Sequence, residues 1–515
     1  MGWFRRPLPT ALLLVVVWTG LRLAWLKYAG IPRPVVSDEF SYLLAADTFA
    51  HGRLANPPHP LGRFFESADE LFRPTYASKY PPGQALFLAL GQRLFGSPFY
   101  GVVIGSSLML FCFCLMLFAW VPYPAALAVS LMFALCLQPN MYWMSSYWGG
   151  SLAAAGSALV LLAVGVYRKR QTPLAGLIFS LGALLLFWTR PYEGAVFTIA
   201  VLAVFARELW SQRRLSVVLA ALPVLVLGGA WTCYYNMAVT GSPLRVPYLT
   251  YERQYSVTPA LWILPLRPEP VYAHSNLART HGAKGSDANE YQNQQPWTRG
   301  LWIGFTSSLE KLISALGLSA LFTLVIPIAW RDPRYRKVAL VTAILLLAFT
   351  LETVHFKHYT APAWASLALM IVFWTERCWR LRIGKYPAGA ALAVLALLAS
   401  PASIAYQGVV YWKRMTPAGQ WPMRREAIIA RLSKLDGPQL LIVRYPYFWD
   451  EWVYNSYDID GQRVVLAHDL GDRQNRVLLD YYHDREVWIL TFDPVSRLEH
   501  LEPYPPPSQE QTTKP

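Results

Sequence analysis

Charged residues are scarce in this chain. Asp, Glu, Lys and Arg make up 15% of its 515 residues, and hydrophobic residues make up 54%. Soluble domains carry about a quarter charged residues, so this composition excludes the several soluble domains that the length alone would suggest. Because apolar runs recur along most of the chain, we expect one large membrane domain.

The chain also lacks any arrangement of cysteines that would build a scaffold. All five cysteines (Cys112, Cys114, Cys136, Cys233 and Cys378) lie in or beside apolar segments. Cys112 and Cys114 are two residues apart, so a helix points them to different faces. This pattern indicates small buried hydrophobic residues and excludes a disulfide framework or a cysteine metal site.

No long basic tract accompanies the net charge of +15. The Lys and Arg residues gather in short clusters between apolar runs, as topology determinants of membrane proteins do. A nucleic-acid-binding surface would instead show basic residues interleaved with aromatic ones. We therefore expect the membrane as a partner and no nucleic acid.

The apolar runs predict a polytopic α-helical membrane protein with about eleven transmembrane helices, although several runs are shorter than the ~20 residues of a straight span. The first run resembles a signal peptide. It carries Arg22 and bulky residues where a cleavage site would have small ones, which indicates a retained span. The predicted helices are Leu8–Leu26, Phe99–Trp120, Ala125–Asn140, Trp148–Tyr167, Leu174–Thr189, Gly194–Arg207, Leu215–Met237, Leu312–Trp330, Val338–Leu351, Pro362–Glu376 and Ala388–Tyr406.

The basic clusters predict that the N-terminus lies in the cytoplasm. With Arg5 and Arg6 inside, counting the spans alternately puts four further clusters into cytoplasmic loops, as the positive-inside rule requires. These clusters are Arg168–Arg170, Arg207 with Arg213 and Arg214, Arg331–Lys337 and Arg377–Lys385.

The same topology sends three segments to the outer face. Residues 27–95 and 238–311 form two large outer loops within a transmembrane domain of residues 1–408. Residues 409–500 hold the strand-like runs LLIVRY, RVVLAHD and EVWILTF between helix-like stretches, which predicts a small extracytoplasmic α/β domain. A disordered tail is expected at residues 501–515.

An acidic pair, Asp38 and Glu39, opens the first outer loop. The following residues FSYLLAADTFA are typical of a short amphipathic helix on the membrane surface. A carboxylate at the start of a helix is stabilised in its ionised form by the positive end of the helix dipole. Such an oriented carboxylate is suited to act as a general base, although solvated loop charges would also give this pattern.

Later in the same loop, Lys79 precedes a rigid turn, Tyr80-Pro81-Pro82-Gly83, and another apolar helix. An interfacial Lys that extends toward the headgroups is common at such a place. A Lys at headgroup height can also bind a phosphate group as a point charge.

The order of these features resembles the GT-C membrane glycosyltransferases, among them the protein O-mannosyltransferases and the lipid A aminoarabinose transferases. These enzymes have one N-terminal span, an outer loop beginning with Asp-Glu, a Lys-Pro-Pro motif, a surface helix and many further spans. The resemblance implies that Asp38 and Glu39 form the catalytic DE motif, with Tyr42 following. It implies that Lys79 holds the donor phosphate, with Tyr80 inserted before the prolines. It covers about the first 240 residues.

Outer positions later in the chain supply further candidates. Arg190 and Glu193 lie at a turn at membrane depth, where charged residues either pair with each other or serve a function. His358 and Tyr359, next to Lys357, loosely match a family position where a tyrosine reaches the carrier phosphate. Arg245, after the seventh span, is a candidate phosphate or acceptor contact, or an ordinary interfacial arginine.

The resemblance implies an inverting glycosyltransferase that transfers a sugar from a polyprenyl-phosphate donor to a lipid, glycan or protein acceptor. The site would lie on the extracytoplasmic face of the plasma membrane. The single compact acidic pair favours chemistry without a cofactor or metal, with a divalent cation left open because GT-C oligosaccharyltransferases use one. The alternatives are a transporter or flippase of lipid-linked sugars and a non-catalytic polysaccharide-assembly or sensor protein. A transporter would carry ionisable residues in mid-span, whereas here they cluster at span ends.

Overall fold

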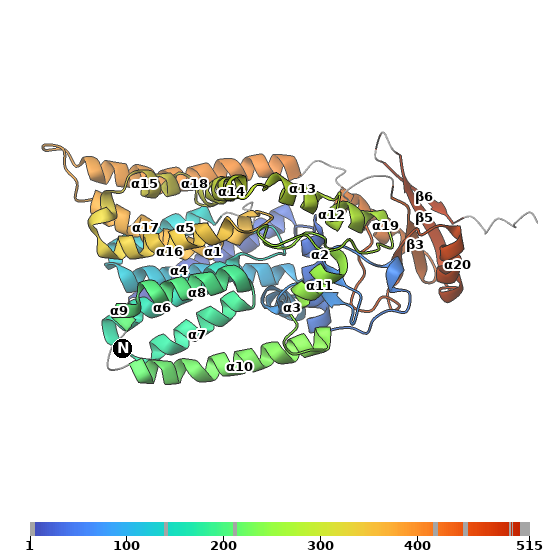
Figure 1. Ribbon diagram of the computed structural model, residues 1–515. Helices are drawn as coiled ribbons and strands as arrows, with labels where there is room; N and C mark the ends of the chain where they lie inside the picture. Colours follow the sequence, from blue (N-terminus) through green and yellow to red (C-terminus); the bar gives the residue numbers. More distant parts are fainter. Residues whose placement is uncertain are drawn as a thin grey trace, which may run out of the picture.

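The computed structural model describes residues 6–137, 143–209, 214–415, 421–445, 452–493, 496 and 498–504. The end of the third predicted span and the predicted tail beyond residue 504 lie outside these ranges. Figure 1 shows a bundle of long helices at one end of the molecule, a β-sheet at the other, and short helices between them.

The bundle has helical structure at each of the eleven predicted segments. Five of the described helices, α1, α4, α6, α10 and α18, are long and apolar enough to cross a membrane. The crossing of the shorter helices stays a prediction. The bundle consists of α1 (Pro7–Ala29), α4 (Phe99–Trp120), α5 (Tyr123–Cys136), α6 (Ser151–Arg170), α7 (Pro173–Phe187), α8 (Pro191–Val204), α9 (Ala206–Leu209), α10 (Arg214–Thr240), α14 (Trp297–Leu316), α15 (Leu318–Val325), α16 (Pro333–Phe349), α17 (Ala363–Cys378) and α18 (Ala388–Met415).

The prediction of a single helix over Leu312–Trp330 is wrong. Gly317 has a φ of 65° and separates α14 from α15, and Pro327 precedes the 3-10 helix η3 (Ile328–Arg331). Glycine tolerates this left-handed backbone, and proline lacks the N–H group that would continue α15. Helix α14 instead begins at Trp297, inside the segment that the sequence predicts as the second outer loop.

Small residues allow the central helices to approach closely. A Cβ atom on Gly156 of α6 would lie 2.9 Å from the carbonyl oxygen of Gly182 in α7. Helix α17 is buried on nearly all sides, whereas α10 exposes most of its apolar side chains. Close packing of small residues is typical of membrane bundles, and an exposed helix that is apolar all round is suited to contact lipid.

Between bundle and sheet lie the two outer loops. They contain α2 (Ser37–Ala50), η2 (Gly62–Phe64), β1 (Glu70–Leu71), β2 (Ala77–Ser78), α3 (Pro82–Phe95), α11 (Pro247–Tyr255), α12 (Ser275–His281) and α13 (Ser286–Asn293). The 3-10 helix η4 (Lys357–Thr360) belongs to neither loop and lies just before α17. The predicted helix after the acidic pair is present as α2. It is not an amphipathic surface helix, because side chains on all its faces are buried against neighbouring elements.

The C-terminal part folds around a four-stranded sheet with the order β4-β3-β5-β6. The central strand β3 (Gln439–Val443) runs parallel to β4 (Val464–His468) and to β5 (Glu486–Phe492). Helices α19 (Trp421–Leu432) and α20 (Asp472–Tyr481) occupy the two helix-like stretches. Strand β6 (Glu499–Pro503) pairs antiparallel with β5, and these ladder bonds give regular structure to residues 501–503, which the sequence assigns to the tail.

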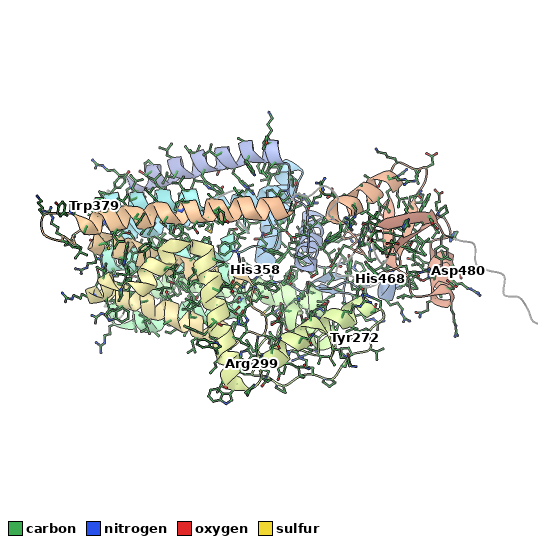
Figure 2. The ribbon with its side chains drawn as sticks, turned by 90° about the horizontal axis from the view of Figure 1, so that it is seen from above. Tyr272, Arg299, His358, Trp379, His468 and Asp480 are labelled. Atoms are coloured by element: carbon green, nitrogen blue, oxygen red, sulfur yellow. The ribbon has the colours of Figure 1, made fainter. Side chains whose placement is uncertain are left out.

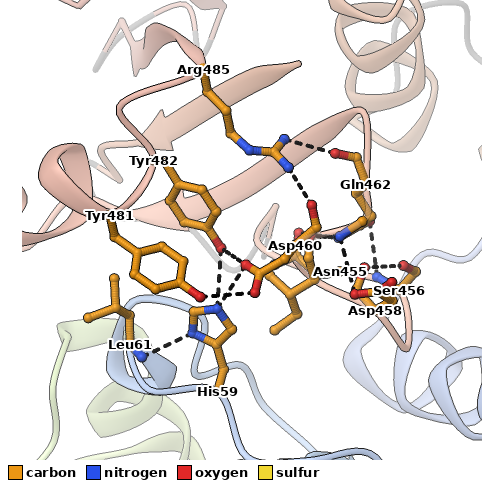
Figure 3. A network of polar contacts seen from close by, with 12 residues as sticks. His59, Leu61, Asn455, Ser456, Asp458, Asp460, Gln462, Tyr481, Tyr482 and Arg485 are labelled. Atoms are coloured by element: carbon orange, nitrogen blue, oxygen red, sulfur yellow. Dashed lines mark hydrogen bonds and ion pairs between the residues drawn. The ribbon is translucent and has the colours of Figure 1, made fainter.

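A polar network joins the C-terminal part to the first outer loop (Figure 3). His59 Nδ1 accepts a bond from the Leu61 N–H group, so its Nε2 carries the proton and donates to Asp460 Oδ1 at 3.0 Å. The hydroxyls of Tyr482 and Tyr481 donate to the two Asp460 oxygens at 2.6 and 3.0 Å. The network thus gives His59 a structural role, because it holds the first outer loop against the C-terminal part.

The candidate site lies at the end of the bundle that faces the sheet. Figure 2 shows Trp379 at the far end of the bundle, His358 where the bundle meets the outer segments, and His468 close to the sheet. The basic loop Arg377–Lys385 begins in the last turn of α17, at that far end. The bundle therefore separates this loop from the candidate site, while the orientation in the membrane stays a prediction.

We expect Gly83→Ala to lower the thermal stability of the protein. The Gly83 N–H group donates to the Trp188 carbonyl oxygen at 2.7 Å, and an added Cβ would lie 2.6 Å from that oxygen. Such overpacking costs about 1–3 kcal/mol. Gly229→Ala is the control, because nothing lies within 4 Å of its added Cβ. Equal melting temperatures for the two variants in detergent would contradict this close contact.

Candidate active site

A short β-hairpin places Asp69 opposite Lys79. In the β1–β2 ladder Glu70 pairs with Ser78. Asp69 and Lys79, the residues next to this pair, therefore lie opposite each other, and the Lys79 N–H group donates to the Asp69 carbonyl at 3.2 Å. Asp69 has a φ of 70°, a left-handed conformation that aspartate adopts more readily than most residues. The hairpin thus brings two residues that are ten apart in sequence into direct side-chain contact.

The Lys79 ammonium group is held by this contact. Its Nζ atom lies 2.5 Å from Asp69 Oδ1, and the two side chains are 9% and 8% exposed. It also lies 4.7 Å from the ring centroid of Tyr251 and 5.1 Å from that of Tyr248. Burial alone would lower the pKa of Lys79, but Asp69 and Asp38 outweigh it and raise the pKa above its usual range. Lys79 is therefore a fixed positive charge.

Asp38 lies in the first turn of α2 and keeps part of its surface open. Its Oδ1 atom accepts a hydrogen bond from the Tyr80 hydroxyl. Burial and the neighbouring Asp69 raise the pKa of Asp38 to about 6, against the opposing effects of Lys79, the Tyr80 bond and Arg190. The carboxylate is ionised at neutral pH and can still take up a proton, which is the property that a general base needs.

Glu39 points to a different neighbourhood from Asp38 and is 1% exposed. One of its carboxylate oxygens accepts the Val35 N–H group at 2.7 Å, and the other accepts the Tyr147 N–H group at 3.0 Å. One oxygen thus fixes the backbone ahead of α2, and the other fixes the backbone at the turn before α6. This geometry favours a positioning role for Glu39 over the catalytic role that the family resemblance implies.

Arg190 enters the site between α7 and α8. Its guanidinium lies 4.4 Å from the ring centroid of Tyr359 and 3.8 Å from Glu193 Oε1, so the ion pair at this turn is long. The Arg190 charge lowers the pKa of Asp38, and the Asp38 charge raises the pKa of Tyr359. The contact between Gly83 and Trp188 connects this turn to the start of α3. Arg190, Glu193, Tyr359 and Asp38 therefore belong to one cluster.

The other predicted residues divide into two groups. Tyr42 stacks on Tyr80 with centroids 4.4 Å apart, and the His358 ring stacks on Trp148 at 5.4 Å. Burial lowers the pKa of His358 well below its usual range, and Arg190 lowers it further, so the imidazole is neutral. Lys357 and Arg245 do not join the cluster: the charges that act on Lys357 are Lys311 and Glu310, and the Arg245 side chain is exposed on its turn.

Three residues of the site could not be predicted from the sequence. Asp69, Tyr251 and Glu352 carry no motif, and each reaches the site through contacts between distant segments. The Tyr251 hydroxyl accepts the Asp69 N–H group at 2.8 Å and bonds to His281 Nε2 at 2.9 Å. This connects the second outer loop to the pair formed by Asp69 and Lys79. Among the described residues, no group of three His, Cys, Asp or Glu side chains is arranged to hold a metal ion.

Comparison with known proteins identifies the fold. No family model matches the chain, and none of the curated proteins matches its sequence. A solved structure of the Archaeoglobus fulgidus oligosaccharyltransferase, tethered to an acceptor peptide with the NVT sequon, does match. It has a TM-score of 0.50 and 12% identity, and the match covers 96% of this chain and 70% of that one. The fold is GT-C.

Two further GT-C structures are similar at lower scores. ArnT from Cupriavidus metallidurans, bound to undecaprenyl phosphate, has 14% identity and a TM-score of 0.46, with 92% of each chain covered. The mycobacterial arabinofuranosyltransferase AftD has 14% identity and a TM-score of 0.38, with 83% of this chain and 30% of that one covered. The GT-C fold predicted from the sequence is confirmed. The match to the Archaeoglobus fulgidus enzyme covers 96% of this chain, so the likeness extends beyond the first 240 residues.

We expect Glu39→Gln to lower the melting temperature and Asp38→Asn to leave it unchanged or raise it. An amide at position 39 replaces one of two acceptor oxygens by a donor that faces a backbone N–H group, which costs about 1–3 kcal/mol. An amide at position 38 keeps an acceptor for Tyr80 and removes the repulsion from Asp69. Thermal unfolding of both variants tests this, and the reverse order of stabilities would contradict the assigned roles.

Proposed function

We propose that this protein is an integral membrane glycosyltransferase of the inverting type. It takes a sugar from a polyprenyl-phosphate donor and transfers it to an acceptor hydroxyl on the extracytoplasmic face of the plasma membrane. The observation that carries the proposal is the placement of Asp38. This partly open carboxylate, with a pKa near 6, lies in the field of two cations, the buried Lys79 and the mostly buried Arg190.

The arrangement supports a direct displacement. The acceptor oxygen attacks the anomeric carbon from the face opposite the phosphate, while its proton passes to the Asp38 carboxylate. The bond between the anomeric carbon and the phosphate oxygen breaks, and its electron pair leaves with the phosphate. Lys79 and Arg190 stabilise the charge on the leaving group, which is the main electrostatic requirement of such a step.

Each cation has the capacity to meet a phosphate. Lys79 has three N–H donors, and Asp69 occupies one side of the ammonium group. Arg190 is only loosely paired with Glu193, so its fork of N–H groups is available to an oxyanion.

A transporter of lipid-linked sugars is the competing function. Its coupling groups would lie in mid-span or in broken helices near the membrane centre. The groups assembled around Asp38 come instead from helix starts, a hairpin and interhelical turns. This placement favours chemistry at the interface over translocation.

Asp38→Asn should reduce sugar transfer by about 10²–10⁴-fold, because loss of a general base has an effect of this size. Mass analysis of cell-surface glycans and glycolipids, with purified protein as a second assay, measures the effect. Asp47→Asn is a matched control on the same helix, since the Asp47 carboxylate accepts bonds from Gln92 and the Tyr457 backbone instead. Normal transfer by Asp38→Asn would refute the role of Asp38.

The transfer rate should rise about tenfold per pH unit below pH 6 and level off above it, because only the ionised Asp38 accepts a proton. Tyr80→Phe should move this midpoint to higher pH, since the Tyr80 hydrogen bond favours the ionised form. Tyr42→Phe, which keeps that bond, should leave the midpoint in place. A pH profile that is identical in the wild type and Tyr80→Phe would argue against Asp38 as the titrating base.

A further inference from the structure

Glu352 is a buried carboxyl group without a hydrogen-bond partner. It follows the end of α16 and is 6% exposed, and neither of its side-chain oxygens bonds to any described residue. An unsatisfied buried polar group costs free energy, so most buried carboxyl groups have partners. A group that lacks one needs an explanation in terms of strain or of a ligand.

The backbone around Glu352 is held rigidly by the second outer loop. The Trp262 N–H group donates to the Leu351 carbonyl at 3.1 Å, and the Thr353 N–H group donates to the Ala260 carbonyl at 2.9 Å. The Thr353 hydroxyl donates to the Pro259 carbonyl at 2.7 Å. Bonds on both sides of Glu352 therefore fix the backbone from which its carboxyl group projects.

The Glu352 carboxyl group lies within electrostatic range of the candidate active site. It acts electrostatically on Tyr359, whose ring lies under the Arg190 guanidinium, and it is affected by Arg190 and Glu193. Glu352 follows α16, which packs against α8, the helix that begins directly after Arg190. The described contacts of Arg190 do not include a hydrogen bond to Glu352, so Arg190 leaves both oxygens available.

The protonation state of Glu352 indicates the kind of group that it can bind. Burial raises the pKa of Glu352 well above its usual range, and the nearby Glu193 raises it further. The neutral acid has one O–H donor and free acceptor capacity. A pair of hydroxyl groups matches this combination, because each hydroxyl both donates and accepts. A phosphate oxyanion offers acceptors alone and suits the cations nearby.

We propose that Glu352 binds hydroxyl groups of the donor sugar and so helps to select which sugar is transferred. This inference rests on the proposed glycosyltransferase function, because it places the sugar next to Arg190 and the phosphate. Different residues of the site would then recognise different parts of the donor. Lys79 and Arg190 recognise the phosphate common to all lipid-linked sugars, and Glu352 recognises the part that differs between them.

The test compares the binding of undecaprenyl phosphate with that of a panel of undecaprenyl-phosphate hexoses and pentoses, using the full-length protein in nanodiscs. The wild type should bind at least one sugar-bearing probe about tenfold more tightly than undecaprenyl phosphate, as two hydrogen bonds to the sugar would allow. Glu352→Met, which is similar in size and cannot bond, should bind all probes equally. Glu352→Gln, whose amide donates and accepts, should recover part of the preference.

Two controls separate binding from folding. Glu290→Met replaces an exposed glutamate of α13 and should keep the wild-type preference. The melting temperature of ligand-free Glu352→Met should equal or exceed that of the wild type, because the substitution removes an unsatisfied buried carboxyl group. A purely structural role for Glu352 would instead lower the melting temperature.

The outcomes distinguish the two levels of the proposal. If the wild type prefers a sugar-bearing probe and Glu352→Met keeps that preference, the inference is wrong and the glycosyltransferase function stands. If the wild type binds undecaprenyl phosphate and every sugar-bearing probe equally, the sugar contact is also refuted. If the wild type binds none of the probes, both the inference and the proposed donor class are overturned.

Discussion

The ion pair between Lys79 and Asp69 is the interaction on which the rest of the site depends. Lys79, the cation with the larger effect on Asp38, forms a close ion pair with Asp69. Asp38 therefore lies beside the like-charged Asp69 carboxylate and beside a cation that is already paired. Burial disfavours the ionised form of Asp38, and the remaining attraction to Lys79 and Arg190 keeps the shift moderate. The ion pair thus gives Asp38 a pKa close to the value at which a base is effective near neutral pH.

The outer loops and the C-terminal part stabilise this arrangement from outside the membrane bundle. Tyr251 of α11 bonds to the backbone of Asp69, and His281 of α12 bonds in turn to Tyr251. His274 and His468 stack with centroids 3.8 Å apart, and the Nε2 atom of each lies 2.7 Å from the Glu66 carbonyl oxygen. Three segments that are far apart in sequence therefore meet behind the hairpin, which makes the site a product of the whole chain.

Much of the fold could be predicted from local sequence patterns. Apolar runs located the bundle helices, strand-like runs between helix-like stretches located β3, β4 and β5, and the Asp-Glu motif located the start of α2. The failures have identifiable causes. Gly317 and Pro327 break a run that composition alone reads as continuous, and contacts with the neighbouring segments bury a helix expected at the surface. Glu352 reaches the site through tertiary pairing with residues 259–262, which no local pattern encodes.

We expect a lipid-linked sugar to bind with its phosphate between Lys79 and Arg190 and its anomeric carbon next to Asp38. A cryo-EM structure of the protein with a non-hydrolysable polyprenyl-phosphate sugar analogue tests this most directly. Phosphate oxygens should lie within hydrogen-bond distance of Lys79 Nζ and the Arg190 guanidinium, with the open side of Asp38 facing the anomeric carbon. An analogue bound elsewhere in the molecule, with Asp38 remote from the sugar, would contradict it.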